Sequence, residues 1–219
     1  CVLRRHRHAR LGNILGSGFV NAGRMAISDP SLQNLPRDDP LVRDAFIARE
    51  GRTLLLCDYD QIEMRLLAHF SGDETLRRFF HETDDVFTAM ARQLFQDESI
   101  TKKDPRRQIN KTASYAKIFG AGAARFADTA GVSFEAGRTF LQHYDRTFPG
   151  VSAFQRRVAQ VAGDRDREEG RAYVVTPYGR RHTVAGHEDA YKLVNYLIQG
   201  TAADVLKQKI VELSTAGVG

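Results

Sequence analysis

The chain has 219 residues, 42% of them hydrophobic, which is enough to form one or two hydrophobic cores that need no disulfide or metal ion for stability. Its 32 Lys and Arg exceed its 27 acids, and the net charge of +5 would attract nucleic acid, although many proteins without that ligand share such an excess. No apolar run approaches the roughly 18 residues of a membrane-spanning helix, and Cys1 and Cys57 lie far apart, so we expect a soluble, cytoplasmic protein with reduced thiols.

The predicted elements are mostly helical. Residues 1–23 are basic and then glycine-rich, and we expect them to form an irregular N-terminal segment. The run TLLLC at 53–57 predicts a buried strand, and the pattern from Ile62 to Phe70 predicts a helix directly after it. Further helices are predicted at 74–95, 105–119, 133–148, 151–165 and 189–213, and a hairpin is predicted at 173–184.

Asp58 stands at the end of the predicted strand, where a side chain is held rigidly enough to position a metal ion. We therefore expect Asp58 to bind Mg²⁺. Asp60 would share its face if the chain stays extended, but Asp60 and Glu63 also have the spacing of a helix capping box. For Asp60 we favour the cap.

Four residues of the predicted helix at 105–119 recur at every fourth position, which places them in one stripe: Arg107, Lys111, Tyr115 and Phe119. Two cations at this spacing with no acid between them cost roughly 0.2–0.5 kcal/mol on an isolated helix. This cost suggests an external anion such as a triphosphate, and the alternative is a solvated basic face.

A third group of residues suits the DNA minor groove. Hydrogen-bond acceptors lie in similar places on the minor-groove edges of A·T and G·C pairs, so Arg, Asn and Gln donors can hold paired DNA whatever its sequence. Capping of loops and helices is the alternative for each amide alone. The group comprises Arg24, Gln33, Asn34, Asn195 and Gln199.

These segments, in this order, resemble family A DNA polymerases over about residues 22–210. DYDQIEMR, from Asp58 to Arg65, is similar to motif A, and the stripe in RRQINKTASYAKIFG is similar to motif B. The resemblance implies an α+β fold of the polymerase right-hand type, with a partial palm sheet and predominantly helical fingers. We expect palm at 1–70, fingers at 71–185 and a palm helix at 186–219.

The resemblance also implies the role of each residue. Asp58 and Tyr59 would hold the metal, while Arg107 and Lys111 would act in catalysis by gripping the triphosphate. Tyr115 would pack on the sugar and base, and tyrosine at this position accompanies acceptance of dideoxynucleotides. The nucleotide pocket would also include Gln61, Glu63 and Phe119, and the DNA contacts would be Arg24, Gln33, Asn34, Asn195 and Gln199.

The chain departs from the family pattern at three of these places. Phe119 replaces the usual tyrosine, Phe87 replaces a histidine that often helps to hold the triphosphate, and Tyr191 stands where the bacterial enzymes usually have arginine. We expect lower nucleotide affinity from Phe87 unless another group substitutes. Asp204, in a predicted amphipathic helix, is expected to be structural. The sequence AKIFGAG and these substitutions resemble phage enzymes more than bacterial ones.

The predicted function is template-directed DNA synthesis from dNTPs on primer-template DNA, with two Mg²⁺ ions, by a monomer that does not bind membranes. One alternative is a catalytically incomplete fragment that binds nucleotide and primer-template, because the motif C sequence His-Asp-Glu does not occur between Cys1 and Gly219. The other alternative is a single-subunit RNA polymerase. Glu63 favours DNA, because the resemblance implies that it blocks a ribose 2′-hydroxyl.

Overall fold

The computed structural model describes residues 11–12, 22–27, 35–36, 39–48, 50–186 and 189–218. The chain forms two compact units, residues 1–60 and residues 61–219. In the first unit, β1 (Leu11–Gly12) pairs antiparallel with β2 (Ala26–Ile27), and α1 spans Pro40–Asp44. The Arg24 side chain is exposed just before β2. Two predicted DNA-binding residues, Gln33 and Asn34, lie outside the described residues.

The buried strand predicted at 53–57 is wrong. Residues 53–57 form no strand, and the side chains of Leu54, Leu55 and Leu56 are 53%, 72% and 82% exposed. A strand is stable only when a neighbouring strand satisfies its backbone groups, and no described residue pairs with this segment. The apolar run therefore did not predict the conformation of this segment, which remains unpaired among the described residues.

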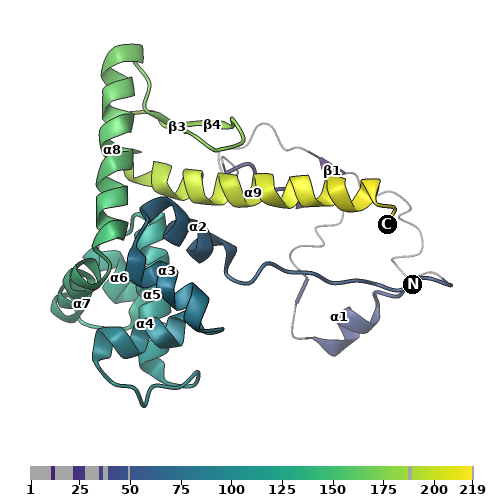
Figure 1. Cartoon of the computed structure of the whole chain (residues 1–219), viewed down its shortest axis with the longest axis horizontal. Helices are drawn as coiled ribbons and strands as arrows, with labels where there is room; N and C mark the ends of the chain where they lie inside the picture. The colour runs from purple at the N-terminus through teal and green to yellow at the C-terminus, as the bar shows by residue number, and fades with distance from the viewer. Residues whose placement is uncertain are drawn as a thin grey trace. The chain divides into compact units, whose positions relative to one another are not determined.

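The second unit combines a cluster of shorter helices with two long helices and a hairpin (Figure 1). Its shorter helices are α2 (Ile62–Ser71), α3 (Glu74–Glu82), α4 (Val86–Phe95), α5 (Pro105–Phe119), α6 (Ala123–Ala130) and α7 (Phe134–Thr147). The long helices are α8 (Pro149–Glu169) and α9 (Tyr191–Thr215), and between them β3 (Tyr173–Val175) pairs antiparallel with β4 (Arg181–Thr183). None of the helices in the described part of the chain is long and apolar enough to cross a membrane.

Side-chain caps explain several of the helix starts. Asp73, Asp85 and Asp104 accept hydrogen bonds from main-chain N–H groups at the starts of α3, α4 and α5. The helix predicted at 74–95 is therefore two helices, because Asp85 begins a new one. The expected cap of α2 by Asp60 is wrong: the N-cap residue is Gln61, in the left-handed region, and it makes no side-chain cap bond.

The core of the second unit forms where α5 meets the surrounding helices. α5 contacts α4, α6 and α9, and its buried Ala113 and Ile118 are fully enclosed. The largest fully buried side chains come from the elements around it, among them Met64, Met90, Phe126, Tyr144, Phe148 and Leu193. Burying such side chains stabilises the fold by about 1.5–3 kcal/mol each. One side of α5 is therefore fixed within the core.

The hairpin is held to α9 by a buried carboxylate. Asp204 is 7% exposed, and it accepts hydrogen bonds from Thr176 Oγ1 at 3.0 Å and from Arg180 Nε and Nη2 at 2.9 and 2.6 Å. These contacts join both ends of the turn between β3 and β4 to one position on the helix. The structural role expected for Asp204 is confirmed, because its carboxylate is already occupied by these donors.

A pair of glycine substitutions tests the packing of the hairpin on α9. A Cβ at Gly200 would lie 2.4 Å from His182 Nε2, whereas a Cβ at Gly163 in α8 would meet nothing within 4 Å. We expect Gly200→Ala to destabilise the protein by about 1–3 kcal/mol through overpacking. Gly163→Ala should stabilise it by about 0.5–1 kcal/mol, because alanine loses less backbone entropy in a helix. Urea denaturation measures both, and equal effects would contradict the packing.

Candidate functional site

The stripe predicted on α5 is partly exposed: Arg107, Lys111 and Tyr115 are half-buried and Phe119 is exposed. Tyr115 and Phe119 stack with ring centroids 6.2 Å apart and planes inclined by 23°. Phe87 of α4 continues the series, with its ring 6.1 Å from that of Tyr115. Phe119 is 43% exposed at the end of the helix. The stripe is thus an aromatic row preceded by the two cations, Arg107 and Lys111.

Three of the four stripe residues line a cleft of about 520 Å³ between α5, α6 and the start of α9. They are Lys111, Tyr115 and Phe119. The opposite walls add Arg125, Tyr191 and Lys192, which the sequence analysis did not assign to a nucleotide site. Aromatic faces beside cations suit a ligand that has both flat rings and negative charge.

Gly120 brings the end of α5 against the start of α9. Its φ of +66° is in the left-handed region that glycine adopts readily. A Cβ at this position would lie 2.8 Å from Tyr191 Cδ2 and 2.9 Å from the Tyr191 carbonyl oxygen. A side chain here would push the two helices apart, so the glycine sets the width of the cleft at this end.

Arg107 does have an acidic partner, contrary to the expectation of a stripe without one. Arg107 Nη2 donates to Asp85 Oδ1 at 2.9 Å, and Arg107 Nε donates to Asp85 Oδ2 and to Thr88 Oγ1, both at 3.1 Å. Asp85 is 22 positions earlier in the chain, at the N-cap of α4, so helical spacing on α5 could not reveal it. The sequence DVFT carried one local signal, an acid three residues before a threonine at a helix start.

The Asp85 carboxyl is ionised in this contact. Burial raises the pKa of Asp85, but hydrogen bonds from Arg107 and Thr88, together with the Arg107 charge, lower it more, so the pKa lies below its ordinary value. The carboxylate also accepts from the Thr88 main-chain N–H at 3.3 Å and from Thr88 Oγ1 at 2.7 Å. Asp85 therefore starts α4 and binds α5 at the same time.

Lys111 differs from Arg107 in its surroundings. No described carboxylate lies within ion-pair distance of Lys111, and its Nζ lies 5.6 Å from the centroid of the Phe87 ring. The Arg107 guanidinium lies 5.8 Å from the same centroid. Phe87 is 2% exposed, so a single buried ring faces both cations. Phe87, which was expected to lower nucleotide affinity, thus contacts Arg107 and Lys111, the two side chains expected to bind the triphosphate.

Other predicted site residues meet between α2 and α9. Gln199 Nε2 donates to Glu63 Oε1 at 3.3 Å, which joins a predicted DNA-binding residue to a predicted nucleotide-binding one. Asn195 lies one turn before Gln199, and its Oδ1 is buried and accepts no hydrogen bond from the described residues. Gln61, at the N-cap of α2, is half-buried.

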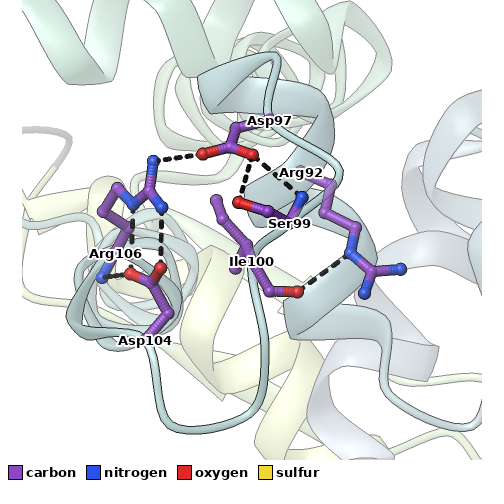
Figure 2. Close-up of polar contacts among 6 residues, drawn as sticks. All are labelled: Arg92, Asp97, Ser99, Ile100, Asp104 and Arg106. Carbon is purple, nitrogen blue, oxygen red and sulfur yellow. Dashed lines mark hydrogen bonds and ion pairs between the residues drawn. The ribbon is translucent and has the colours of Figure 1, made fainter.

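A folded loop between α4 and α5 fixes where α5 begins (Figure 2). Arg106 bridges two carboxylates, donating from Nη1 to Asp97 at 2.8 Å and from Nη2 to Asp104 at 2.7 Å. Asp104 is also the N-cap of α5, where it accepts from the Arg106 main-chain N–H at 2.8 Å. Arg92 Nε donates to the Ile100 carbonyl oxygen at 3.0 Å, which ties the loop back to α4.

Asp58 and Tyr59 belong to the first compact unit, and both side chains are exposed. The Asp58 carboxylate makes no hydrogen bond or ion pair with the described residues. Within the same described ranges, no group of three or more His, Cys, Asp and Glu side chains gathers as a metal site would require. Asp58 is thus an available carboxylate whose companion ligands are not assembled here.

Comparisons with known proteins agree with one another. The family described as DNA polymerase family A matches residues 7–217. The thermostable DNA polymerase I of Thermus filiformis is 36% identical over 221 residues, covering 94% of this chain and 26% of the relative. The DNA polymerase of Mycobacterium phage D29 is 34% identical over 204 residues, covering 91% of this chain and 32% of the relative.

Among solved structures, the chain is similar to the POL domain of Pol1 from M. smegmatis, in a complex with DNA primer-template and dNTP. The TM-score is 0.75 at 30% identity, over 90% of this chain and 36% of that one. This likeness confirms the polymerase fold expected from the motifs. The chain spans about a quarter to a third of the length of the two curated relatives.

The loop before α5 generates a prediction about pH. Hydrogen bonds from the Ser99 side chain, the Ser99 main-chain N–H and Arg106 lower the pKa of Asp97 from 3.8 to about 2. A carboxyl with a lowered pKa in the folded state contributes stability above its unfolded pKa and loses it as the pH falls through the folded value. The stability advantage of the wild type over Asp97→Asn should therefore be full at pH 6 and should shrink between pH 4 and pH 2.

Thermal unfolding of both proteins across that pH range checks the prediction. The Ser99→Ala variant is the control, because it removes one of the donors and should move the loss of stability to higher pH. An advantage that stays constant down to pH 2 would contradict the role assigned to Asp97.

Proposed function

The chain belongs to DNA polymerase family A, and on that premise we propose that it supplies the nucleotide-binding cleft of a template-directed DNA polymerase. In the reaction, the primer 3′-hydroxyl attacks the α-phosphate of a dNTP and pyrophosphate leaves. The observation that carries the proposal is the α5 stripe, in which a lysine that pairs with no described carboxylate precedes two stacked aromatic rings along the wall of the cleft.

Lys111 and Arg107 would bind the triphosphate. A triphosphate carries several negative charges, and charge-assisted hydrogen bonds to phosphate are roughly twice as strong as neutral ones. Lys111 faces the cleft with its charge uncompensated by any described carboxylate, whereas Arg107 keeps its contact with Asp85 on one edge. The two cations would therefore contribute unequally to triphosphate binding. Lys111 would contribute the less neutralised charge, and Arg107 would contribute the more rigidly held one.

Tyr115 and Phe119 would bind the flat parts of the substrates. Tyr115 would pack on the sugar and base of the dNTP, with Glu63 and Gln61 completing the sugar pocket, and Phe119 would stack near the template base. Stacking of a base on an aromatic side chain contributes about 1–3 kcal/mol and tolerates any base. That indifference suits an enzyme that must accept four nucleotides.

Primer-template DNA is the proposed macromolecular ligand. The Asn195 and Gln199 side chains lie on one helix, and their amide N–H donors would serve the minor groove together with Arg24. Gln33 and Asn34 are proposed for the same role from the resemblance alone. We further propose a cytoplasmic monomer, with fingers at 71–185 and palm at 1–70 and 186–219.

Asp58 would be the principal metal ligand. Its exposed carboxylate, which has no partner in the part of the chain that the structure describes, and the main-chain oxygen of its neighbour Tyr59 are donors of the type that Mg²⁺ prefers. When bound, Mg²⁺ in such enzymes stabilises the negative charge of the attacking and leaving oxygens. This chain's own residues would orient the triphosphate through Lys111 and Arg107 and exclude a ribose 2′-hydroxyl through Glu63.

Replacing Lys111 with Ala tests the assignment of the cleft. We expect the Kd for dNTP to rise about tenfold or more, because a charge-assisted contact is lost, while the Kd for primer-template changes much less. Fluorescence titration with each ligand measures the two constants. Lys103→Ala, an exposed lysine in the preceding loop, should change neither; equal losses for both ligands in Lys111→Ala would make α5 only a basic surface.

Tyr115→Phe tests contact with the sugar. The phenolic hydroxyl can act as a donor or acceptor where a dideoxynucleotide lacks its own hydroxyl. In the polymerase that contains this sequence, the substitution should therefore increase discrimination against dideoxynucleotides while leaving dNTP incorporation near its original rate. The ratio of dideoxy to deoxy incorporation on one template checks this, and an unchanged ratio would remove Tyr115 from the sugar pocket.

A further inference from the structure

Asp85 has more polar contacts than a helix cap requires. Both carboxylate oxygens receive hydrogen bonds from Arg107, Oδ1 from Nη2 at 2.9 Å and Oδ2 from Nε at 3.1 Å. The Thr88 hydroxyl donates to Oδ2 and accepts from Arg107 Nε, so it closes a three-residue network. Asp85 is only 9% exposed, and Phe87 and Thr88 beside it are buried.

This network holds the Nε and Nη2 edge of the Arg107 guanidinium and leaves the Nη1 edge without a hydrogen bond to the described residues. Nε and Nη2 are engaged by Asp85 and Thr88, while Nη1 makes no hydrogen bond within the described ranges. Arginine presents five N–H donors in a planar fork, so the two N–H groups of Nη1 and one of Nη2 remain for another anion. The buried Phe87 ring, facing both Arg107 and Lys111, further restricts where the two cations can lie.

We propose that Asp85 is a positioning residue for substrate: it fixes Arg107 through one edge so that the Nη1 edge is presented, together with Lys111, to the phosphates of a nucleoside triphosphate. The proposal rests on the proposed function, because it takes Arg107 and Lys111 as triphosphate ligands. Asp85 itself does not touch the substrate.

The structure favours positioning over competition between Asp85 and the phosphates. If Asp85 only neutralised Arg107 until an anion displaced it, the carboxylate should be free to withdraw. It is instead held by the Thr88 main-chain N–H and hydroxyl at the start of α4. A long side chain fixed in advance loses less freedom when a ligand binds.

Asp85→Asn separates the charge from the cap. Asparagine caps helices as well as aspartate does, so α4 should keep its start while the grip on Arg107 weakens. We expect the Kd for dNTP to rise about three- to tenfold. The Kd for the matching nucleoside monophosphate should change little, because the loss concerns phosphates beyond the first.

Asp73→Asn is the matched control. Asp73 caps α3, accepts from the Leu76 main-chain N–H at 3.0 Å and is 4% exposed, but none of the described arginines pairs with it. The substitution removes the charge of a buried helix cap whose donors among the described residues are main-chain N–H groups, and it should leave the affinity for dNTP unchanged. A similar loss of dNTP affinity in both variants would make the effect of Asp85 a general effect on helix starts.

A double-mutant cycle with Arg107→Ala decides the proposal. Asp85→Asn should weaken dNTP binding in the wild-type background and have no further effect once Arg107 is absent. Equal losses in both backgrounds, or tighter binding by Asp85→Asn, would overturn the positioning role. If Arg107→Ala and Lys111→Ala both leave dNTP binding unchanged, the proposed function fails; if they weaken it and Asp85→Asn does not, only the positioning role fails.

Discussion

The ion pair between Asp85 and Arg107 decides how α5 meets α4, and the candidate site depends on the placement of α5. A second contact between these helices runs from Asn110 Nδ2 to the Phe87 carbonyl oxygen at 3.0 Å. The other end of α5 is tied to α7 by the largely buried Lys117, which pairs with Asp145. Truncating one member of such a pair costs more than the pair contributes, since it leaves a charge without its partner.

These anchors leave one face of α5 available. The polar contacts of Arg107, Asn110 and Lys117 with α4 and α7 fix the helix along its length, and the core contacts of its alanines and Ile118 fix it laterally. Lys111 and the two aromatic rings that follow it are not used by these anchors and line the cleft instead. A binding surface on a rigid helix keeps its geometry when ligand arrives, which is the condition for strong preorganised binding.

Local chemistry could be predicted from the sequence, whereas contacts between distant residues could not. The helix at 105–119 was predicted to the residue, because Asp104 and Pro105 start it and Gly120 ends it. The Asp85 contact escaped prediction, since nothing on α5 points to a carboxylate on another helix. Leu54, Leu55 and Leu56 were predicted as a strand from composition, but a strand also needs a partner, and their exposure shows that composition alone was insufficient.

Photolabelling with an azido-dNTP tests most directly whether the α5 cleft holds the nucleotide. A second, more polar cleft of about 530 Å³ lies beside α4, lined by Glu82, Arg92 and Lys102 among others, and offers a competing location. If the α5 cleft holds the nucleotide, mass spectrometry will find the label on the peptide that carries Tyr115 and Phe119, and excess dNTP will prevent the labelling. Label recovered from the walls of the second cleft, with the α5 peptide unmodified, would contradict the account.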